Sequence, residues 1–324
     1  MYLGVDGGGT KTALALVDRD GRLLAQHLTS AAHYIATSMD EVRSLLHAAV
    51  HMLLAKAAMP ASAVDFAYFG LPSYGEDSTL TGALDALPGG CLPAGHFRCG
   101  NDMVCGWAGS LGGADGISVV AGTGSISYGE RGGAAARCGG WGELFSDEGS
   151  AYWIACRGLN LYSRMSDGRV PRGPLHRLFN QRLELKHDLD LCAHVYSAAA
   201  ADRSRVAQLS RLVHEAAMMG DEQAAGLFTQ AAEELAELVD TTRQRLGYLA
   251  DEPVPVSYSG GVFAHGGNLL VPRFASALRA RWPSYELREP LLPPDIGAAL
   301  YAARLHRSPL GAQAIERLRQ RGHS

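Results

Sequence analysis

Apolar and polar residues alternate along the first 30 positions in a pattern that predicts a glycine-rich β-hairpin. A short apolar strand ends at Asp6, and the glycines Gly7 to Gly9 follow it. Residues 13–17 then alternate as in a second strand, and the turn at residues 18–21 leads into a third. The glycines therefore join two strands and do not open a helix.

An equivalent pattern recurs one domain length later. An apolar strand beginning at Ile117 runs into the turn Gly122, Thr123, Gly124, and a third turn, Gly260 and Gly261, follows the apolar residues 254–258. A single unit of this kind is typical of an ordinary tight hairpin. Its repetition indicates an internal duplication, and we expect two half-sites to face each other across a cleft that holds one nucleotide.

Other segments carry helix and strand patterns. Ser38 and Glu41 form a capping box that predicts a helix extending to about Ala58. Residues 64–71 and 96–100 read as buried strands. Strands alternating with crossover helices favour an α/β fold.

The second half of the chain becomes helix-rich between residues 146 and 249. Within it, residues 221–249 carry the i, i+3/i+4 apolar stripe of a core-facing helix. Residues 295–305 form an apolar closing helix. We expect this helix to pack back on the first domain.

The pattern of elements places the domain change near residues 103–115. We expect a first domain over residues 1–112, completed by residues 296–324. The second domain then spans residues 113–295.

Composition narrows the class of protein. The 324 residues carry a formal net charge of −4 with no basic stripe, so we expect no nucleic-acid partner. No apolar run reaches membrane-spanning length, and a first strand starting at Tyr2 leaves no room for a signal peptide. The six cysteines show no C-x-x-C pair. We therefore expect them to be small buried apolar side chains of a cytoplasmic protein.

The first glycine turn does not match the common nucleotide motifs. Thr10, Lys11 and Thr12 break the P-loop spacing, and Thr12 replaces the third glycine of a dinucleotide fingerprint. Successive exposed N–H groups at such a turn nevertheless suit phosphate oxygens. The turn is therefore a candidate phosphate site of another kind.

Four acids, Asp6, Asp102, Asp147 and Glu148, lie at or just beyond predicted strand ends, where cleft groups gather in α/β folds. Asp6 precedes the first glycine turn and is a candidate for holding Mg²⁺; the alternative is an acid that caps the turn. Asp102 follows the strand at residues 96–100 and begins a helix. It could take the proton from an attacking hydroxyl or cap the helix, and these two roles are compatible.

The segment 138–150 is the densest cluster of candidate chemistry. Gly140 and Gly142 flank Trp141 on a tight loop, which suits the apolar face of a sugar. Asp147 and Glu148 follow at the start of a helix expected from Ala151. The alternative is a loop tryptophan packed between domains.

These segments together resemble the N-acetylglucosamine kinase branch of the BadF/BadG/BcrA/BcrD ATPase family. The matching stretches are GVDGGGTKT (4–12), NDMVCGWAG (101–109), AGTGS (121–125), GGWGELFSDEGSAYWIA (139–155) and SGGV (259–262). The family belongs to the actin/Hsp70/sugar-kinase superfamily. The resemblance implies an α/β fold of two ribonuclease-H-like domains with ATP between them.

The resemblance also implies roles for individual residues. The phosphate loops correspond to Gly7, Gly8, Gly9, Thr10 and Lys11, and to Gly122, Thr123 and Gly124. The adenosine side corresponds to Gly260 and Gly261, the catalytic base to Asp102, and the acid near Mg²⁺ to Asp6. The sugar contacts correspond to Asn101, Asp102, Gly140, Trp141, Gly142 and Asp147.

The function implied is ATP-dependent phosphorylation of the 6-hydroxyl of N-acetylglucosamine by a cytoplasmic homodimer. The loop at residues 30–34 lacks the Asn with which kinases of this branch often contact the sugar, and Ser146 replaces an expected Gly. Glucosamine therefore remains an alternative substrate. A dehydratase-activating ATPase of the same family is a further alternative, although the scattered cysteines and the sugar loop disfavour it.

Overall fold

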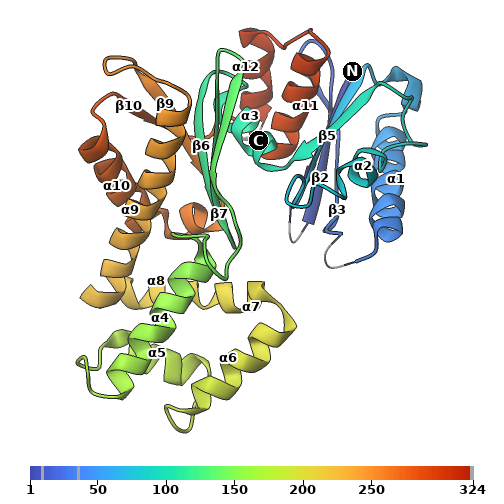
Figure 1. The fold of residues 1–324 in the computed structure, drawn as a ribbon. Helices are drawn as coiled ribbons and strands as arrows, with labels where there is room; N and C mark the ends of the chain where they lie inside the picture. Colours follow the sequence, from blue (N-terminus) through green and yellow to red (C-terminus); the bar gives the residue numbers. More distant parts are fainter. Residues whose placement is uncertain (9–10, 35–36, 322–324) are drawn as a thin grey trace. The chain divides into compact units, whose positions relative to one another are not determined.

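The computed structural model describes residues 1–8, 11–34 and 37–321, and the chain divides into two compact units. The first unit comprises residues 1–115 and 289–324, and the second comprises residues 116–288 (Figure 1). The first unit is therefore assembled from both ends of the chain.

The first unit is built on a mixed sheet with the order β3-β2-β1-β4-β5. Its strands are β1 (Tyr2–Gly7), β2 (Lys11–Val17), β3 (Leu23–Ser30), β4 (Phe66–Leu71) and β5 (Phe97–Asn101). The first three strands form an antiparallel meander, and β4 and β5 run parallel to β1. The predicted hairpin at the first glycine turn is confirmed.

Helices cover both faces of this sheet. They are α1 (Met39–Lys56), the short 3₁₀ helix η1 (Ala61–Ala63), α2 (Thr81–Asp85), α3 (Met103–Leu111), α11 (Pro294–Leu305) and α12 (Ala312–Arg321). Leu46 and Val50 of α1 pack in one core with Leu3 and Val5 of β1. The opposite face of β1 is covered by α11, which also packs against α3.

The predicted capping box is present at the start of α1. The Glu41 amide donates to the Ser38 hydroxyl, and the Ser38 amide donates to the Glu41 carboxylate. The buried strand expected from Val64 begins instead at Phe66, because η1 occupies the residues just before it.

The second unit repeats the topology of the first. Its strands are β6 (Gly116–Ala121), β7 (Ser125–Arg131), β8 (Ala134–Gly139), β9 (Val254–Ser259) and β10 (Tyr285–Arg288), in the order β10-β9-β6-β7-β8. An antiparallel meander is again followed by two strands parallel to the first strand. This matching connectivity confirms the internal duplication and identifies each unit as ribonuclease-H-like.

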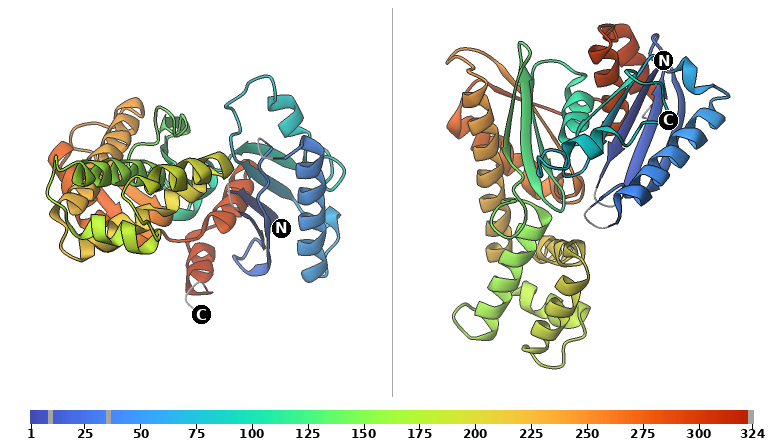
Figure 2. Two further views of the ribbon diagram at one scale, coloured as in Figure 1. Left: turned by 90° about the horizontal axis from the view of Figure 1, so that it is seen from below. Right: turned by 45° about the vertical axis from the view of Figure 1, so that its right-hand side comes forward.

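The helices of the second unit form two groups, which the right-hand view of Figure 2 distinguishes. The sheet packs against α9 (Glu222–Arg245) and α10 (Gly261–Arg281). The second group is a helical cluster of α4 (Ala151–Ser166), α5 (Pro174–Arg182), α6 (Asp190–Ala201), α7 (Arg203–Gln208) and α8 (Ser210–Met218). The predicted core-facing helix is α9, which Asp221 caps by accepting from the Ala224 amide.

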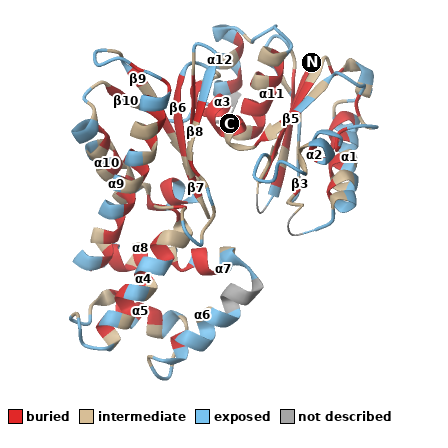
Figure 3. Ribbon diagram, in the orientation of Figure 1, coloured by how far each residue is buried: buried red, intermediate tan, exposed pale blue. Residues whose placement is uncertain are grey.

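The central strands β1 and β6 and one side of α9 are buried. Much of α6 is exposed (Figure 3). Within the described ranges, no helix is both long and apolar enough to cross a membrane.

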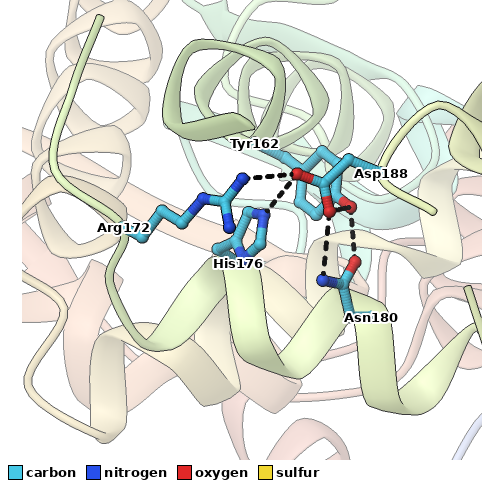
Figure 4. A network of polar contacts seen from close by, with 5 residues as sticks. All are labelled: Tyr162, Arg172, His176, Asn180 and Asp188. Atoms are coloured by element: carbon cyan, nitrogen blue, oxygen red, sulfur yellow. Dashed lines mark hydrogen bonds and ion pairs between the residues drawn. The ribbon is translucent and has the colours of Figure 1, made fainter. Parts of the chain in front are cut away.

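A partly buried polar network joins residues of the helical cluster (Figure 4). Asp188, in the connection from α5 to α6, accepts from Arg172 Nη2 at 2.9 Å, His176 Nε2 at 3.1 Å and Asn180 Nδ2 at 3.3 Å. The Tyr162 ring stacks on His176 with centroids 4.9 Å apart, and its hydroxyl donates to Asn180 Oδ1. Burial and the Asp188 carboxylate raise the pKa of Tyr162 to about 12, so this hydroxyl keeps its proton.

Asp188→Ala should destabilise the protein by about 1–3 kcal/mol, because His176 is 5% exposed and would be left without its acceptor. Thermal or urea unfolding measures the change. The matched control is Asp167→Ala, which removes an exposed ion pair with Arg169 and should change stability by less than about 0.5 kcal/mol. Equal effects of the two substitutions would show that the network contributes nothing specific.

Candidate active site

One edge of the first sheet gathers the predicted acidic and basic residues. Because β1, β4 and β5 are parallel, their carboxyl ends meet at the same edge, and β2 begins there. Asp6 lies near the end of β1, Asp102 directly follows β5, and Lys11 opens β2. This edge therefore brings together two of the predicted acids and the predicted lysine.

The first glycine turn closes with a backbone hydrogen bond from the Gly8 amide to the Lys11 carbonyl at 2.9 Å. A Cβ at Gly7 would lie 2.8 Å from the Gly70 carbonyl oxygen, so the turn packs tightly against the end of β4. Gly9 and Thr10 lie outside the described residues. Their predicted phosphate contacts stay predictions.

Asp6 lies in a strongly perturbed electrostatic environment. Burial raises its pKa, and the carboxylates of Asp102 and Asp295 raise it further, to about 8. The Lys11 ammonium and the Cys105 thiol act in the opposite direction and do not offset the rise. Burial and the two neighbouring carboxylates thus both disfavour the ionised form of Asp6.

Asp102 occupies the N-cap position of α3, but its side chain does not cap the helix. Asn101, the residue before the N-cap, accepts at its Oδ1 from the amide of Met103, the first residue of α3, at 3.0 Å. Asn101 Nδ2 also donates to the Tyr74 carbonyl at 3.1 Å. The capping alternative for the Asp102 carboxylate is therefore wrong, and its role as a base stays a prediction.

The second glycine turn is held by the start of α4. The amides of Ala151 and Tyr152 donate to the carbonyls of Gly122 and Thr123 at 2.9 and 3.3 Å. These amides belong to the first turn of a helix, where no partner within the helix exists. The carbonyl groups of the turn thus pair with amide groups at the helix N-terminus that would otherwise lack a partner.

Gly260 brings the third turn to the second. Its φ is +99°, and a Cβ there would lie 2.4 Å from the Ala121 carbonyl oxygen. Because β6 and β9 are parallel neighbours, Gly260 and Gly261 lie at the same sheet edge as Gly122. The predicted phosphate-side and adenosine-side turns of this unit are therefore adjacent.

Asp147 is turned inward in the second unit. It is 4% exposed and has a φ of +62°. Burial raises the pKa of its carboxyl, and the nearby backbone of Ser125 and Gly142 acts in the opposite direction. A Cβ at Gly124 would lie 2.5 Å from Asp147 Oδ2. Asp147 therefore ties the loop at residues 140–149 to the second glycine turn, a structural role that the sequence did not reveal.

Trp141 stands at the surface of the same loop. Its side chain is 71% exposed, and the Arg137 guanidinium lies 5.9 Å from its ring centroid. Gly140 and Gly142 have φ values of +70° and +103°, which form the tight loop that the flanking glycines predicted. The aromatic face is available to a ligand.

Two buried residues beside Asp6 were absent from the predicted site. Cys105 of α3 and Asp295 of α11 both act on the Asp6 carboxyl. Their signal in the sequence is weak, because a buried cysteine and an acid in the first turn of a helix are common structural features. Among the described residues, no three His, Cys, Asp or Glu side chains converge as ligands of one metal ion.

Comparison with known proteins agrees with this architecture. Residues 3–302 match the model of the BadF/BadG/BcrA/BcrD ATPase family. The N-acetyl-D-glucosamine kinase of Dictyostelium discoideum is 27% identical, covering 93% of this chain and 97% of its own length. The N-acetylmuramic acid/N-acetylglucosamine kinase of Clostridium acetobutylicum is also 27% identical, with coverages of 88% and 92%.

Solved structures show the same fold. A proposed N-acetylglucosamine kinase from Chromobacterium violaceum superposes with a TM-score of 0.71 at 25% identity, covering 92% of this chain and 97% of that one. A ROK family glucokinase from Streptomyces griseus gives a TM-score of 0.55 at 17% identity, with coverages of 94% and 99%. This second likeness shows the fold alone. The match to the family model extends over most of the chain, and the protein therefore belongs to the BadF/BadG/BcrA/BcrD ATPase family.

Proposed function

We propose that the protein is an ATP-dependent amino-sugar kinase that transfers the γ-phosphoryl group to the 6-hydroxyl of N-acetylglucosamine. The observation that carries the proposal is the sheet edge where Asp6, Lys11 and Asp102 gather. Phosphoryl transfer depends on positioning and charge neutralisation, and this edge supplies both an ammonium and carboxylates. The two kinases that match nearly the whole chain support the same reaction.

The glycine turns are the proposed nucleotide contacts. Gly7, Gly8 and Lys11, together with Gly9 and Thr10, would face phosphate oxygens from the first unit. Gly122, Thr123 and Gly124 would do so from the second unit, with Gly260 and Gly261 beside the adenosine. Gly260 leaves no room for a side chain because the backbone of Ala121 and Gly122 packs against it, and this contact keeps the third turn beside the second.

The acidic edge fits a divalent cation. The charges of Asp102, Asp295 and Lys11 all act on the Asp6 carboxyl, and carboxylate oxygens are the ligands that Mg²⁺ prefers. Asp6 would hold the ion, which neutralises phosphate charge when bound. The Asp102 carboxylate would accept the proton of the sugar 6-hydroxyl.

The sugar is proposed to bind at the loop around Trp141, with Gly140, Gly142 and Asn101 also in contact. An exposed tryptophan offers an apolar face. A carboxylate offers about four lone-pair directions, and those of Asp147 would accept sugar hydroxyls. The cytoplasmic location and the homodimer stay predictions.

An ADP-release assay over a panel of sugars tests the proposal. We expect the highest kcat/KM for N-acetylglucosamine, a lower value for glucosamine and a much lower value for glucose, because a site built to hydrogen-bond a substituent rejects analogues that lack it. Glucosamine leading by about tenfold would make the protein a glucosamine kinase. No ADP release with any amino sugar would contradict the proposal.

A matched pair of variants tests the loop. Trp141→Ala should raise KM for the amino sugar, whereas Leu144→Ala should leave it unchanged, although Leu144 lies in the same loop and is 87% exposed. Equal effects of the two substitutions would remove Trp141 from the sugar site.

A further inference from the structure

Helix α11 rests directly on the backbone of β1. A Cβ at Gly4 would lie 2.2 Å from the Asp295 carbonyl oxygen and 2.3 Å from the Ala299 amide nitrogen. Side chains alternate along a strand, so Gly4 and Asp6 belong to the same face of the sheet. The absence of a side chain at Gly4 therefore allows the start of α11 to pack on the same face of the sheet as Asp6.

Helix α3 reaches the same place through a second glycine. A Cβ at Gly70 would lie 2.2 Å from Cys105 Sγ. The Cys105 thiol is fully buried, lies 3.7 Å from the Val5 carbonyl oxygen and also bonds to the Asp6 carboxyl. The two helices meet where Gly297 of α11 packs against the Cys105 carbonyl. One residue of each helix, Cys105 of α3 and Asp295 of α11, thus acts on the Asp6 carboxyl.

The Asp295 carboxylate is buried and hydrogen-bonded. It is 6% exposed, and Gln26 Nε2 donates to its Oδ2 at 2.7 Å. Gln26 lies on β3 opposite Ala15, and Ala15 lies opposite Gly4. Gln26, which binds Asp295, and Gly4, on which α11 packs, therefore belong to one row of residues across the sheet. Among the described residues, no ion pair includes Asp295.

We propose that Asp295, held in place by Gln26, is a positioning residue that acts through Asp6 and strengthens the binding of the nucleotide's divalent cation there. The inference rests on the proposed function insofar as Asp6 faces that cation. A fixed negative charge close to Asp6 attracts a cation and so stabilises the cation-bound state relative to the empty site. This effect is strongest where burial limits screening by water and salt. Asp295 itself does not ligate the ion.

The test is the affinity of the protein for Mn²⁺ in the presence of ADP, followed by electron paramagnetic resonance without any sugar. Mn²⁺ serves as the probe because it shares the preference of Mg²⁺ for oxygen ligands. Asp295→Asn keeps the shape of the side chain and an acceptor for Gln26, and it should weaken Mn²⁺ binding by about tenfold. In steady-state assays, KM for the sugar should stay unchanged while the Mg²⁺ requirement rises.

Asp221→Asn is the matched control. Asp221 is also buried, at 4% exposure, and lies at a helix N-terminus, where it accepts from the amides of Ala224 and Leu175. Its substitution should lower thermal stability and leave Mn²⁺ affinity unchanged. Gln26→Leu, which frees the Asp295 carboxylate without removing it, should weaken Mn²⁺ binding by less than Asp295→Asn does.

The outcomes separate this inference from the proposed function. Unchanged Mn²⁺ affinity in folded Asp295→Asn would overturn the positioning role, as would an equal loss in Asp221→Asn. If Asp295→Asn does not fold, unchanged Mn²⁺ affinity in Gln26→Leu would overturn it instead. A wild-type protein that releases no ADP with any amino sugar would contradict the proposed function, yet the Mn²⁺ comparison would still decide the role of Asp295.

Discussion

Asp102→Asn is expected to lower kcat by about 10²–10⁴-fold, the range for loss of a general base, with little change in KM for the sugar. Asparagine keeps the shape of the side chain but cannot accept the proton of the hydroxyl. Because the Asp102 side chain makes no capping bond to α3, the substitution should leave folding nearly intact. Steady-state kinetics and thermal unfolding measured on the same sample test both expectations.

Asn101→Ala provides the contrast. It removes the acceptor of the Met103 amide and the donor to the Tyr74 carbonyl, so it should lower stability by about 1–2 kcal/mol. If Asp102→Asn instead lowers stability and leaves kcat intact, the residue is structural. A loss confined to KM would make it a binding residue.

The glycine turns and the acids at strand ends could be predicted because they depend on local rules. Glycines between two alternating segments indicate a hairpin wherever they occur, and the carboxyl ends of parallel strands share an edge in any α/β sheet. Asp6 and Asp102 could therefore be assigned to one edge before any contact was known. The capping box at Ser38 followed from spacing alone.

Residues whose position depends on tertiary packing could not be predicted in the same way. Asp295 acts on Asp6 only because α11 docks at Gly4, and the sequence around Asp295 contains no trace of that contact. The inward orientation of Asp147 depends similarly on the absence of a side chain at Gly124. In both cases a glycine distant in sequence determines what the acid contacts.

Asp6→Asn is expected to act in opposite directions on activity and on stability. It should lower kcat/KM by about 10²-fold or more, since stabilisation of phosphoryl charge by a metal is worth several kcal/mol. In the absence of nucleotide and cation, however, the carboxylate is held at a pKa of about 8 by burial and by the charges of Asp102 and Asp295. Ionisation of Asp6 therefore opposes folding of the ligand-free protein.

The sign of the pH effect follows from proton binding. The Asp6 carboxyl ionises near 3.8 in an unperturbed chain and near 8 in the folded protein, so between these values the folded state holds a proton that the unfolded state has released. Its contribution to stability is then lost as the pH rises from about 4 to about 8. Asparagine does not ionise, so the variant should have a higher Tm than the ligand-free wild type at pH 8.

Asp65→Asn is the control with the opposite sign. The Asp65 carboxylate is bonded to the amino terminus, which holds its pKa below the usual range, so this group contributes stability that is present above pH 4 and lost as the pH falls. Its substitution should lower the Tm at pH 8 and leave activity unchanged. Full activity of Asp6→Asn, or of the wild type in excess EDTA, would remove Asp6 from the proposed cation site. A Tm of Asp6→Asn below that of the ligand-free wild type at pH 8 would show that Asp6 stabilises the fold, and that its charge is balanced within the protein without a cation.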